Sequence, residues 1–157
     1  MQMTSPELKE PVASLFEQES AKLWRSVFLH TSDPEVASDA VAEAFAQLIR
    51  RGDDVRDPRA WVWRSAFRIA DRDQAANRQQ RLTLEMPTYE LPDTVADLVR
   101  ALRQLSGNQR KAVLLHHLLD LPVAEVASIL GTSRSAVTVH LHRGRRRLRE
   151  ILGDDDD

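Results

Sequence analysis

Residues 123–150, "VAEVASILGTSRSAVTVHLHRGRRRLRE", contain the pattern of a helix-turn-helix. Ala127, Gly131 and Val137 stand at spacings of four and six residues. In such a motif a small residue on the first helix lets the second helix approach closely. A glycine then takes the left-handed turn, and an aliphatic residue of the second helix fills the shared core. The stretch therefore predicts helices at about 122–130 and 133–152 joined by a tight turn.

The second of these helices is expected to have an apolar side and a basic side. At 100° per residue, the positions that share the core side with Val137 are Leu141, Gly144, Leu148 and Ile151. The opposite side carries Ser135, Val139, His142, Arg143, Arg146 and Arg149, with Thr138 at its edge. Small polar residues before a run of Arg suit the DNA major groove, where the first turn reaches base edges and Arg side chains hold phosphates. The predicted DNA contacts are Ser133, Arg134, Ser135, Thr138, Val139, His142, Arg143 and Arg146, of which Arg134, Ser135 and Thr138 are the expected base readers.

The charge of the chain is segregated along its length. The net charge is -2, yet residues 1–50 hold four Lys and Arg against eight acids, and residues 98–153 hold ten against three. The simplest alternative to DNA binding is that the run of Arg lies on the solvated side of an amphipathic helix. The scarcity of compensating acids in this part of the chain, together with the helix-turn-helix spacing, favours a polyanionic partner such as DNA.

The amino-acid composition is typical of a folded, globular protein, and it excludes several kinds of functional site. The sequence has 157 residues, of which 42% are hydrophobic and 29% charged, and it has no cysteine. Disulfides, thiolate zinc sites and a cysteine nucleophile are therefore excluded. No apolar run is long enough for a membrane span or a signal peptide, so we expect a cytoplasmic protein without membrane insertion. His116 and His117 are adjacent and make a poor metal pair, and His140 and His142 are no better, so we expect no metal or other cofactor.

Helical periodicity dominates the sequence, which predicts an all-α fold of two small domains. The first domain is expected over residues 7–81, with helices from Glu7 or Pro11 to His30, from Pro34 to about Arg51, and from about Pro58 onward. Residues 82–94 contain acids and proline but no Lys or Arg, and they predict a flexible acidic linker. The second domain is expected over 95–152, with helices at about 95–105, 107–119, 122–130 and 133–152, followed by an acidic tail at 153–157.

Two long segments of the sequence resemble the extracytoplasmic-function (ECF) sigma factors, the promoter-specificity subunits of bacterial RNA polymerase. Residues 102–152, "LRQLSGNQRKAVLLHHLLDLPVAEVASILGTSRSAVTVHLHRGRRRLREIL", are similar to the fourth conserved region of that family. Residues 32–51, "SDPEVASDAVAEAFAQLIRR", and 57–70, "DPRAWVWRSAFRIA", resemble its second conserved region. The resemblance implies a chain that is not an enzyme. Its first domain would bind core RNA polymerase and the minus-ten element, and its second would read the minus-thirty-five element of promoter DNA.

The third helix carries a basic stripe that suits this implied role. The positions of Trp61, Arg64, Ser65, Arg68 and Arg72 cluster within about 100° of the helix circumference, with Val62, Trp63 and Ile69 on the other side. Arg can hold backbone phosphate, and an indole can stack on an unpaired base. In the family, the positions of Trp61, Ser65 and Arg68 lie against the minus-ten element. The alternative is that Trp61 packs the domain, and for Trp63 core packing is the expectation.

The resemblance also assigns roles to the preceding loop and to the second helix. Residues 50–58, "RRGDDVRDP", resemble the segment that captures a flipped base, which Gly52, Asp53 and Asp54 could surround. The second helix carries "DAVAEAF", where the family has a surface that docks on the largest polymerase subunit. The implied core-polymerase contacts are the acids Asp39 and Glu43 and the apolar pair Val41 and Phe45. The alternative is an ordinary amphipathic helix in which Phe45 belongs to the core and the acids are solvated.

Two other functions are compatible with the sequence. One is a stand-alone helix-turn-helix regulator, which would bind duplex DNA as a dimer without polymerase, whereas a sigma factor of this size is expected to be a monomer when free. The other is a sigma-like interaction module that does not open promoters. Arg68 and Thr138 depart from residues common in the family, and Asp71 and Asp73 add negative charge near the expected DNA surface. An anti-sigma factor is a possible further partner.

Overall fold

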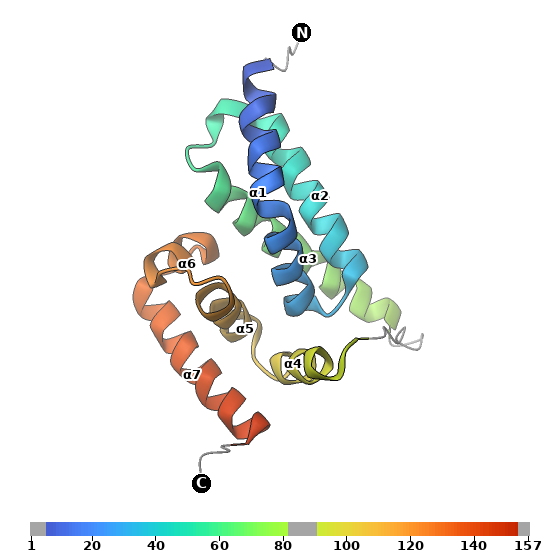
Figure 1. Ribbon diagram of the computed structural model, residues 1–157, viewed down its shortest axis with the longest axis vertical. Helices are drawn as coiled ribbons and strands as arrows, with labels where there is room; N and C mark the ends of the chain where they lie inside the picture. Colours follow the sequence, from blue (N-terminus) through green and yellow to red (C-terminus); the bar gives the residue numbers. More distant parts are fainter. Residues whose placement is uncertain (1–5, 82–90, 154–157) are drawn as a thin grey trace.

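A computed structural model describes residues 6–81 and 91–153, and within these ranges the fold is all-α, as the periodicity predicted (Figure 1). The first part of the chain forms α1 (Pro6–Thr31), α2 (Pro34–Arg51), the short 3-10 helix η1 (Gly52–Asp54) and α3 (Pro58–Arg81). The second part forms α4 (Asp93–Arg103), α5 (Gly107–Val113), η2 (Leu114–Leu118), α6 (Val123–Leu130) and α7 (Arg134–Leu152).

The helix boundaries lie close to the expected ones, except at the end of α5. The helix expected over 107–119 changes at Leu114 into the π-helical turn η2, and the backbone N–H of Leu121 then donates to the carbonyl of Leu115 at 3.2 Å. Most of the predicted acidic linker, residues 82–90, and the end of the tail, residues 154–157, lie outside the described residues. Within residues 6–81 and 91–153, no helix combines the length and apolarity that a membrane crossing requires.

The first bundle consists of α1, α2 and α3, with a core of aliphatic, alanine and aromatic side chains. The turn into α2 is fixed by Asp33, whose carboxylate accepts hydrogen bonds from the backbone N–H groups of Glu35 and Val36, while Pro34 occupies the first helical position. Small residues such as Ala40 and Ala66 are fully buried and let the helices approach closely. Trp63 is also fully buried, which confirms the expectation of core packing.

The second bundle consists of α4 to α7 and contains the helix-turn-helix. Ser106 and Gln109 form a reciprocal capping box that starts α5. Gly144 of α7 lies against α5 so closely that an added Cβ would stand 2.8 Å from the Cγ2 of Val113. A side chain at position 144 would therefore require Val113 or the packing of α7 against α5 to shift, which explains why glycine suits the core side of α7.

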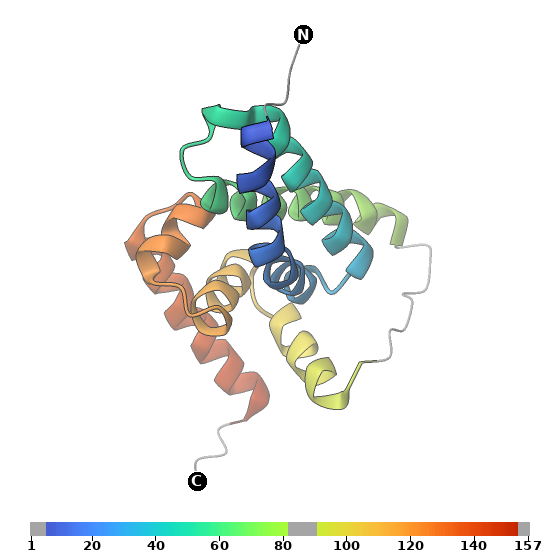
Figure 2. The ribbon, with the colours of Figure 1, turned by 45° about the horizontal axis from the view of Figure 1, so that its top comes forward.

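The two bundles are packed against each other rather than held apart (Figure 2). Helix α3 contacts α6, and α1 contacts α4, α5 and η2. Between them lies a cavity of about 550 Å³ whose lining is largely apolar and includes Trp24, Phe28, Leu98 and Leu119. The contact between the bundles was not part of the expectation from sequence, and it decides which candidate site residues reach solvent.

Candidate nucleic-acid interface

The turn of the helix-turn-helix has the geometry that its sequence predicted. Gly131 ends α6 in the left-handed conformation, with φ of 67°, and the N–H of Thr132 donates to the carbonyl of Ala127 at 3.0 Å. The hydroxyl of Ser133 then caps α7 by accepting a hydrogen bond from the N–H of Ala136 at 3.1 Å. These bonds fix the direction in which α7 leaves the turn.

Helix α7 divides into a buried side and an exposed side along the predicted line. Val137, Leu141 and Gly144 are buried, and Leu148 and Ile151 are half-buried. Val139 is 44% exposed, which leaves it available to contact a base methyl group. All eight predicted contact residues are exposed: Ser133, Arg134, Ser135, Thr138, Val139, His142, Arg143 and Arg146.

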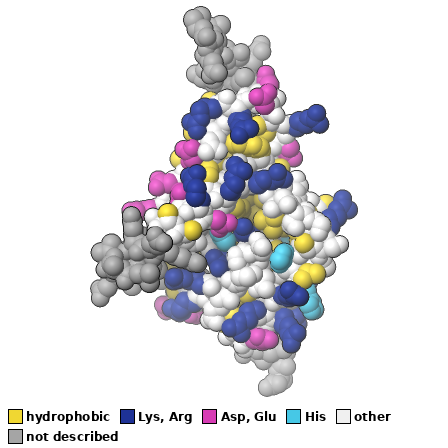
Figure 3. Space-filling view, turned by 180° about the vertical axis from the view of Figure 1, so that it is seen from behind, with side chains coloured by type: hydrophobic (Ala, Val, Ile, Leu, Met, Phe, Trp, Pro, Cys, Tyr) yellow, Lys and Arg dark blue, Asp and Glu magenta, His cyan; other side chains and the backbone are white. Residues whose placement is uncertain are grey.

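The exposed side of α7 is strongly cationic. Within residues 6–81 and 91–153, no carboxylate forms an ion pair with Arg134 or Arg143. Glu150 is the acid nearest the basic run, at 3.6 Å from Arg146 and 3.3 Å from Arg147. Figure 3 shows the result as dark-blue side chains over the lower part of the molecule, where α7 lies, with few acidic ones among them. The surface therefore suits a polyanion.

The basic stripe of α3 is only partly open to solvent. Arg68 and Arg72 are exposed, whereas Ser65 is 1% exposed and cannot face DNA as the stripe predicted. The reason is that α3 is contacted by α1, α2 and α6, so its buried side is wider than periodicity alone indicated. Trp61 is half-buried, and the guanidinium carbon of Arg51 lies 6.0 Å from the centre of its ring.

Arg64, the central cation of the stripe, contacts the second bundle. Its Nε donates to the carbonyl of Ile129 at 3.3 Å, and its Nη2 donates to the carbonyl of Ser128. Both acceptors belong to the last turn of α6, where helix carbonyls lack intrahelical partners. One turn earlier on α3, Arg59 donates to Glu19 of α1 at 2.7 Å and pairs with Glu125 of α6.

Asp71 lies at the interface between the bundles. Its Oδ1 is 2.6 Å from the Nε2 of His30 on α1, and its Oδ2 is 2.9 Å from the Nζ of Lys111 on α5. Partial burial acts to raise the pKa of Asp71, but the hydrogen bond from His30 and the ammonium of Lys111 outweigh it and lower this pKa to about 2. The negative charge that seemed out of place near DNA is therefore matched within the fold. Asp73, in turn, lies 3.3 Å from the Nε of Arg72.

His30 is buried in the same cluster and is expected to be neutral. Burial lowers its pKa below the usual value of 6.5 by more than the carboxylate of Asp71 raises it. The Nε2 faces the carboxylate, so this nitrogen carries the proton. The Nδ1 is buried and, among the described residues, has no hydrogen-bond partner.

This arrangement predicts that acid destabilises the fold through His30. Because the pKa of His30 is lower in the folded chain than in the unfolded chain, the unfolded chain binds more protons as the pH falls below 6.5. The free energy of unfolding should then fall with a slope of up to about 1.4 kcal/mol per pH unit from this residue. Urea unfolding at several pH values between neutral and mildly acidic measures the slope. His30→Gln should flatten this slope; an equal slope in the parent and the variant would refute the assignment.

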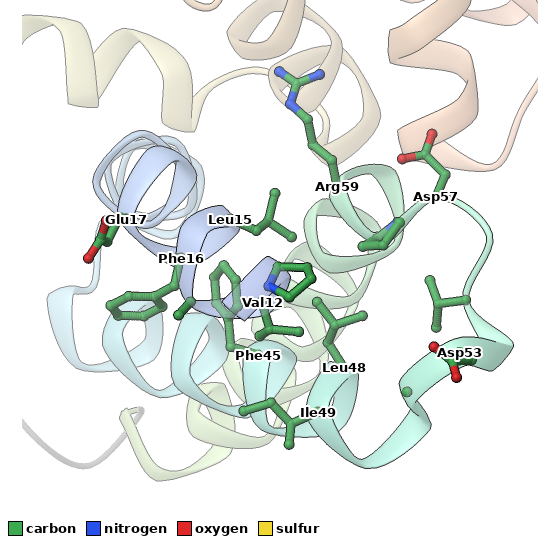
Figure 4. A pocket seen from close by; sticks show the side chains of 15 residues that line it. Val12, Leu15, Phe16, Glu17, Phe45, Leu48, Ile49, Asp53, Asp57 and Arg59 are labelled. Carbon is green, nitrogen blue, oxygen red and sulfur yellow. The ribbon is translucent and has the colours of Figure 1, made fainter. Parts of the chain in front are cut away.

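The loop after α2, where the sequence predicts a site for a flipped base, is exposed at its two acids and borders a cavity. Gly52 has φ of 59° and ends α2, and Asp53 and Asp54 are exposed. The loop borders a cavity of about 750 Å³, but most of the lining consists of apolar side chains, including Phe16, Phe45 and Leu48 (Figure 4). In Figure 4, Asp53 lies at the side of this cavity.

Helix α2 presents its acids to solvent but not its predicted apolar pair. Asp39 is exposed, and Glu43 is half-buried and accepts hydrogen bonds from Gln47 at 2.9 Å and Arg50 at 3.3 Å. Val41 and Phe45 are 7% and 4% exposed, so the prediction that they form a docking surface is wrong for this structure. The physical reason is that α1 covers this side of α2, with the ring of Phe16 edge-on to Phe45 at 5.0 Å. The core-packing alternative is the correct one for Phe45.

Sequence reasoning missed the residues that join the bundles. Arg110 of α5 donates to the carbonyl of His30 and also to the carbonyls of Leu102 and Leu105 in its own bundle. Neither Arg110 nor Lys111 belongs to a recognisable local motif, and their partners are 80 and 40 positions away in the sequence. The only signal in the sequence was the unexpected negative charge at position 71.

Comparisons with known proteins agree with this geometry. The family model for sigma-70 region 4 matches residues 96–148, which contain α6 and all but the last turn of α7. The RNA polymerase sigma-E factor of Streptomyces avermitilis is 30% identical over 148 residues, covering 85% of this chain and 80% of that protein. The ECF RNA polymerase sigma factor BldN of Streptomyces coelicolor is 28% identical over 90% of this chain, which spans 60% of the length of BldN.

Solved structures show the same fold at lower sequence identity. The sigma factor RpoE of Bartonella quintana, solved in complex with the anti-sigma factor NepR, has a TM-score of 0.71 and 19% identity, covering 95% of this chain and 98% of RpoE. CnrH, solved in complex with the cytosolic domain of CnrY, has a TM-score of 0.74 and 22% identity, covering 95% of this chain and 91% of CnrH. These structures show the fold, and the 30% identity to the sigma-E factor over 85% of this chain and 80% of that protein shows that the chain belongs to the ECF family of RNA polymerase sigma factors.

Proposed function

We propose that this chain binds core RNA polymerase and directs it to promoters for the initiation of transcription. The observation that carries the proposal is the exposure of all eight predicted contact residues, seven on α7 and Ser133 at its N-cap, while the opposite side of α7 is buried. Because the chain belongs to the ECF family, we infer that the partner of this surface is promoter DNA. The chemistry of RNA synthesis then belongs to the polymerase, and the chain supplies sequence recognition.

Helix α7 would lie in the major groove of the upstream promoter element. Its N-terminal turn, with Arg134, Ser135 and Thr138, would reach base edges, because a recognition helix contacts bases mainly through its first turns. The hydroxyl of Thr138 donates to the carbonyl of Arg134 at 3.0 Å, so toward DNA it would act as an acceptor. Arg143 and Arg146, farther along the helix, would hold phosphates and position the chain without selecting a sequence.

The first bundle would bind core RNA polymerase and the melted minus-ten element of the promoter. Arg68 and Arg72 are exposed and would hold the phosphates of the single strand, joined by Arg64 and Trp61 where the second bundle does not cover them. Gly52, Asp53 and Asp54 would lie beside a flipped base. Asp39 and Glu43 offer an acidic surface on α2 that would meet basic groups of the polymerase. An anti-sigma factor, as in the RpoE structure, would be the inhibitory partner of this chain.

Run-off transcription from fragmented genomic DNA tests the proposed function. Purified core polymerase is supplied with or without the chain, and the transcript starts are sequenced. We expect new starts that share two spaced upstream motifs. A pull-down with core polymerase interprets a negative result: stable binding without new starts would support a non-opening interaction module, and no binding would support a stand-alone regulator.

A further inference from the structure

Val139 is an apolar side chain in the middle of the cationic side of α7. It points away from the side of the helix on which Val137 is buried. Its exposed neighbours one turn away along the helix are Ser135, His142 and Arg143, all of them polar or basic. Val139 therefore does not belong to an apolar patch of the size on which a protein partner docks. A small apolar group is the partner that fits it.

The direction of the Val139 side chain is fixed by the core behind it. Val137 and Leu141, two residues before and two residues after it, are 0% and 2% exposed and hold this part of α7 against the bundle. A β-branched side chain has one strongly preferred rotamer in a helix, so the two methyl groups of Val139 keep one direction. A contact made by such a side chain costs little conformational entropy. Val139 is therefore preorganised for contact with a group in the major groove.

The apolar group that a base pair presents in the major groove is the 5-methyl group of thymine. Thr138, the residue before Val139, donates its hydroxyl hydrogen to the carbonyl of Arg134 at 3.0 Å, so this hydroxyl can only accept a hydrogen bond from DNA. Consecutive residues rise by about 1.5 Å along a helix, less than the spacing of about 3.4 Å between base pairs. Thr138 and Val139 therefore reach the same or neighbouring pairs. An A·T pair matches both side chains, because it offers the N6 amine of adenine as a donor and the methyl group of thymine.

We propose that Val139 selects a thymine in duplex DNA by packing against its 5-methyl group. The placement of α7 in the major groove rests on the proposed function, and the new element is that an apolar contact carries part of the sequence preference. The contact removes two apolar surfaces from water, and one buried methyl group contributes about fourfold to the affinity. Because neither group is charged, this contribution does not depend on salt, unlike the phosphate contacts of Arg143 and Arg146.

Replacement of thymine by uracil tests the contact, because it removes the methyl group and keeps the hydrogen-bonding groups of the pair. The probe is a duplex enriched from a random-sequence library on the immobilised chain, with uracil placed at each thymine position in turn. Anisotropy titrations give the ratio of the thymine and uracil affinities for each protein. We expect about a fourfold loss at one thymine for the parent chain and no loss there for Val139→Ser. The control variant Leu152→Ser, which also replaces an exposed apolar side chain of α7, should keep the fourfold loss.

Equal affinities of the parent chain for the thymine and uracil duplexes at every position would overturn the role of Val139. A loss that persists unchanged in Val139→Ser would overturn it as well. The titrations contain no polymerase, so their outcome is separate from that of run-off transcription. New transcript starts together with equal affinities would leave the proposed function standing and remove only the role of Val139. A methyl-dependent affinity without new starts would support the role of Val139 in a stand-alone regulator.

Discussion

Replacing Trp63 with alanine should lower the free energy of unfolding by about 3–5 kcal/mol, because it removes a large, fully buried side chain and leaves a cavity. The indole packs beside Phe67, and its Nε1 donates to the Oε2 of Glu19 at 3.2 Å. Glu19 is itself 7% exposed, so the substitution also removes a hydrogen bond from a buried carboxylate. Urea unfolding followed by circular dichroism measures the loss.

Two further variants separate the contributions of Trp63. Trp63→Phe keeps much of the ring volume and loses the donor, so it should cost less than alanine. Trp61→Ala changes the same residue type two positions away, where the indole is only half-buried, and should cost clearly less than Trp63→Ala. A loss for Trp61→Ala as large as that for Trp63→Ala would contradict the position of Trp63 at the centre of the first bundle.

The helix-turn-helix could be predicted in detail because its signals are local. The positions of Ala127, Gly131 and Val137 fix the turn and the contact between α6 and α7. The helical periodicity of 100° per residue then determines which side chains of α7 are exposed to solvent. Trp63 could be assigned to the core for the same reason, since it lies on the apolar side of its helix. Short-range spacing therefore predicted one of the two candidate nucleic-acid surfaces.

Helical periodicity gave wrong predictions where a neighbouring helix makes the buried side of a helix wider. Ser65 was placed with the basic stripe, and Val41 and Phe45 with a docking surface, yet all three are buried. Periodicity gives the direction of a side chain from its own helix axis, but the width of the buried side depends on which helices pack against it. For α3 this includes α6, which begins 42 residues after the end of α3 in the sequence.

The polar contacts between the two bundles could not be predicted because their partners are far apart along the chain. Arg64 lies 64 positions from Ser128, and Lys111 lies 40 positions from Asp71. Each of these residues would be equally reasonable as a solvated charge in its own helix. The contacts explain Asp71, whose charge had counted against a DNA-binding role for α3, because its carboxylate is paired with His30 and Lys111 within the fold.

The double variant Arg143→Ala with Arg146→Ala should weaken binding to duplex DNA by about tenfold for each arginine near 0.1 M salt, because each phosphate contact releases a condensed counterion. Neither side chain is held firmly within the described residues: Arg143 has no carboxylate partner there, and Arg146 is 75% exposed and 3.6 Å from Glu150. The plot of log affinity against log salt should also become shallower by about one unit for each arginine removed. Anisotropy titrations of a mixed-sequence duplex over a range of salt measure both effects.

Two single variants test whether the loss belongs to phosphate binding by the exposed side of α7. Arg147 is next to Arg146 but lies 3.4 Å from Gln104 and 3.3 Å from Glu150, directed toward α4, so Arg147→Ala should change the affinity and the salt slope much less. Ser135→Ala removes a hydroxyl from the first turn and should alter the preference among duplex sequences while leaving the salt slope unchanged. If the double arginine variant instead lost affinity for some sequences and kept it for others, Arg143 and Arg146 would be reading bases, and the division of α7 into a reading turn and a phosphate-binding half would be wrong.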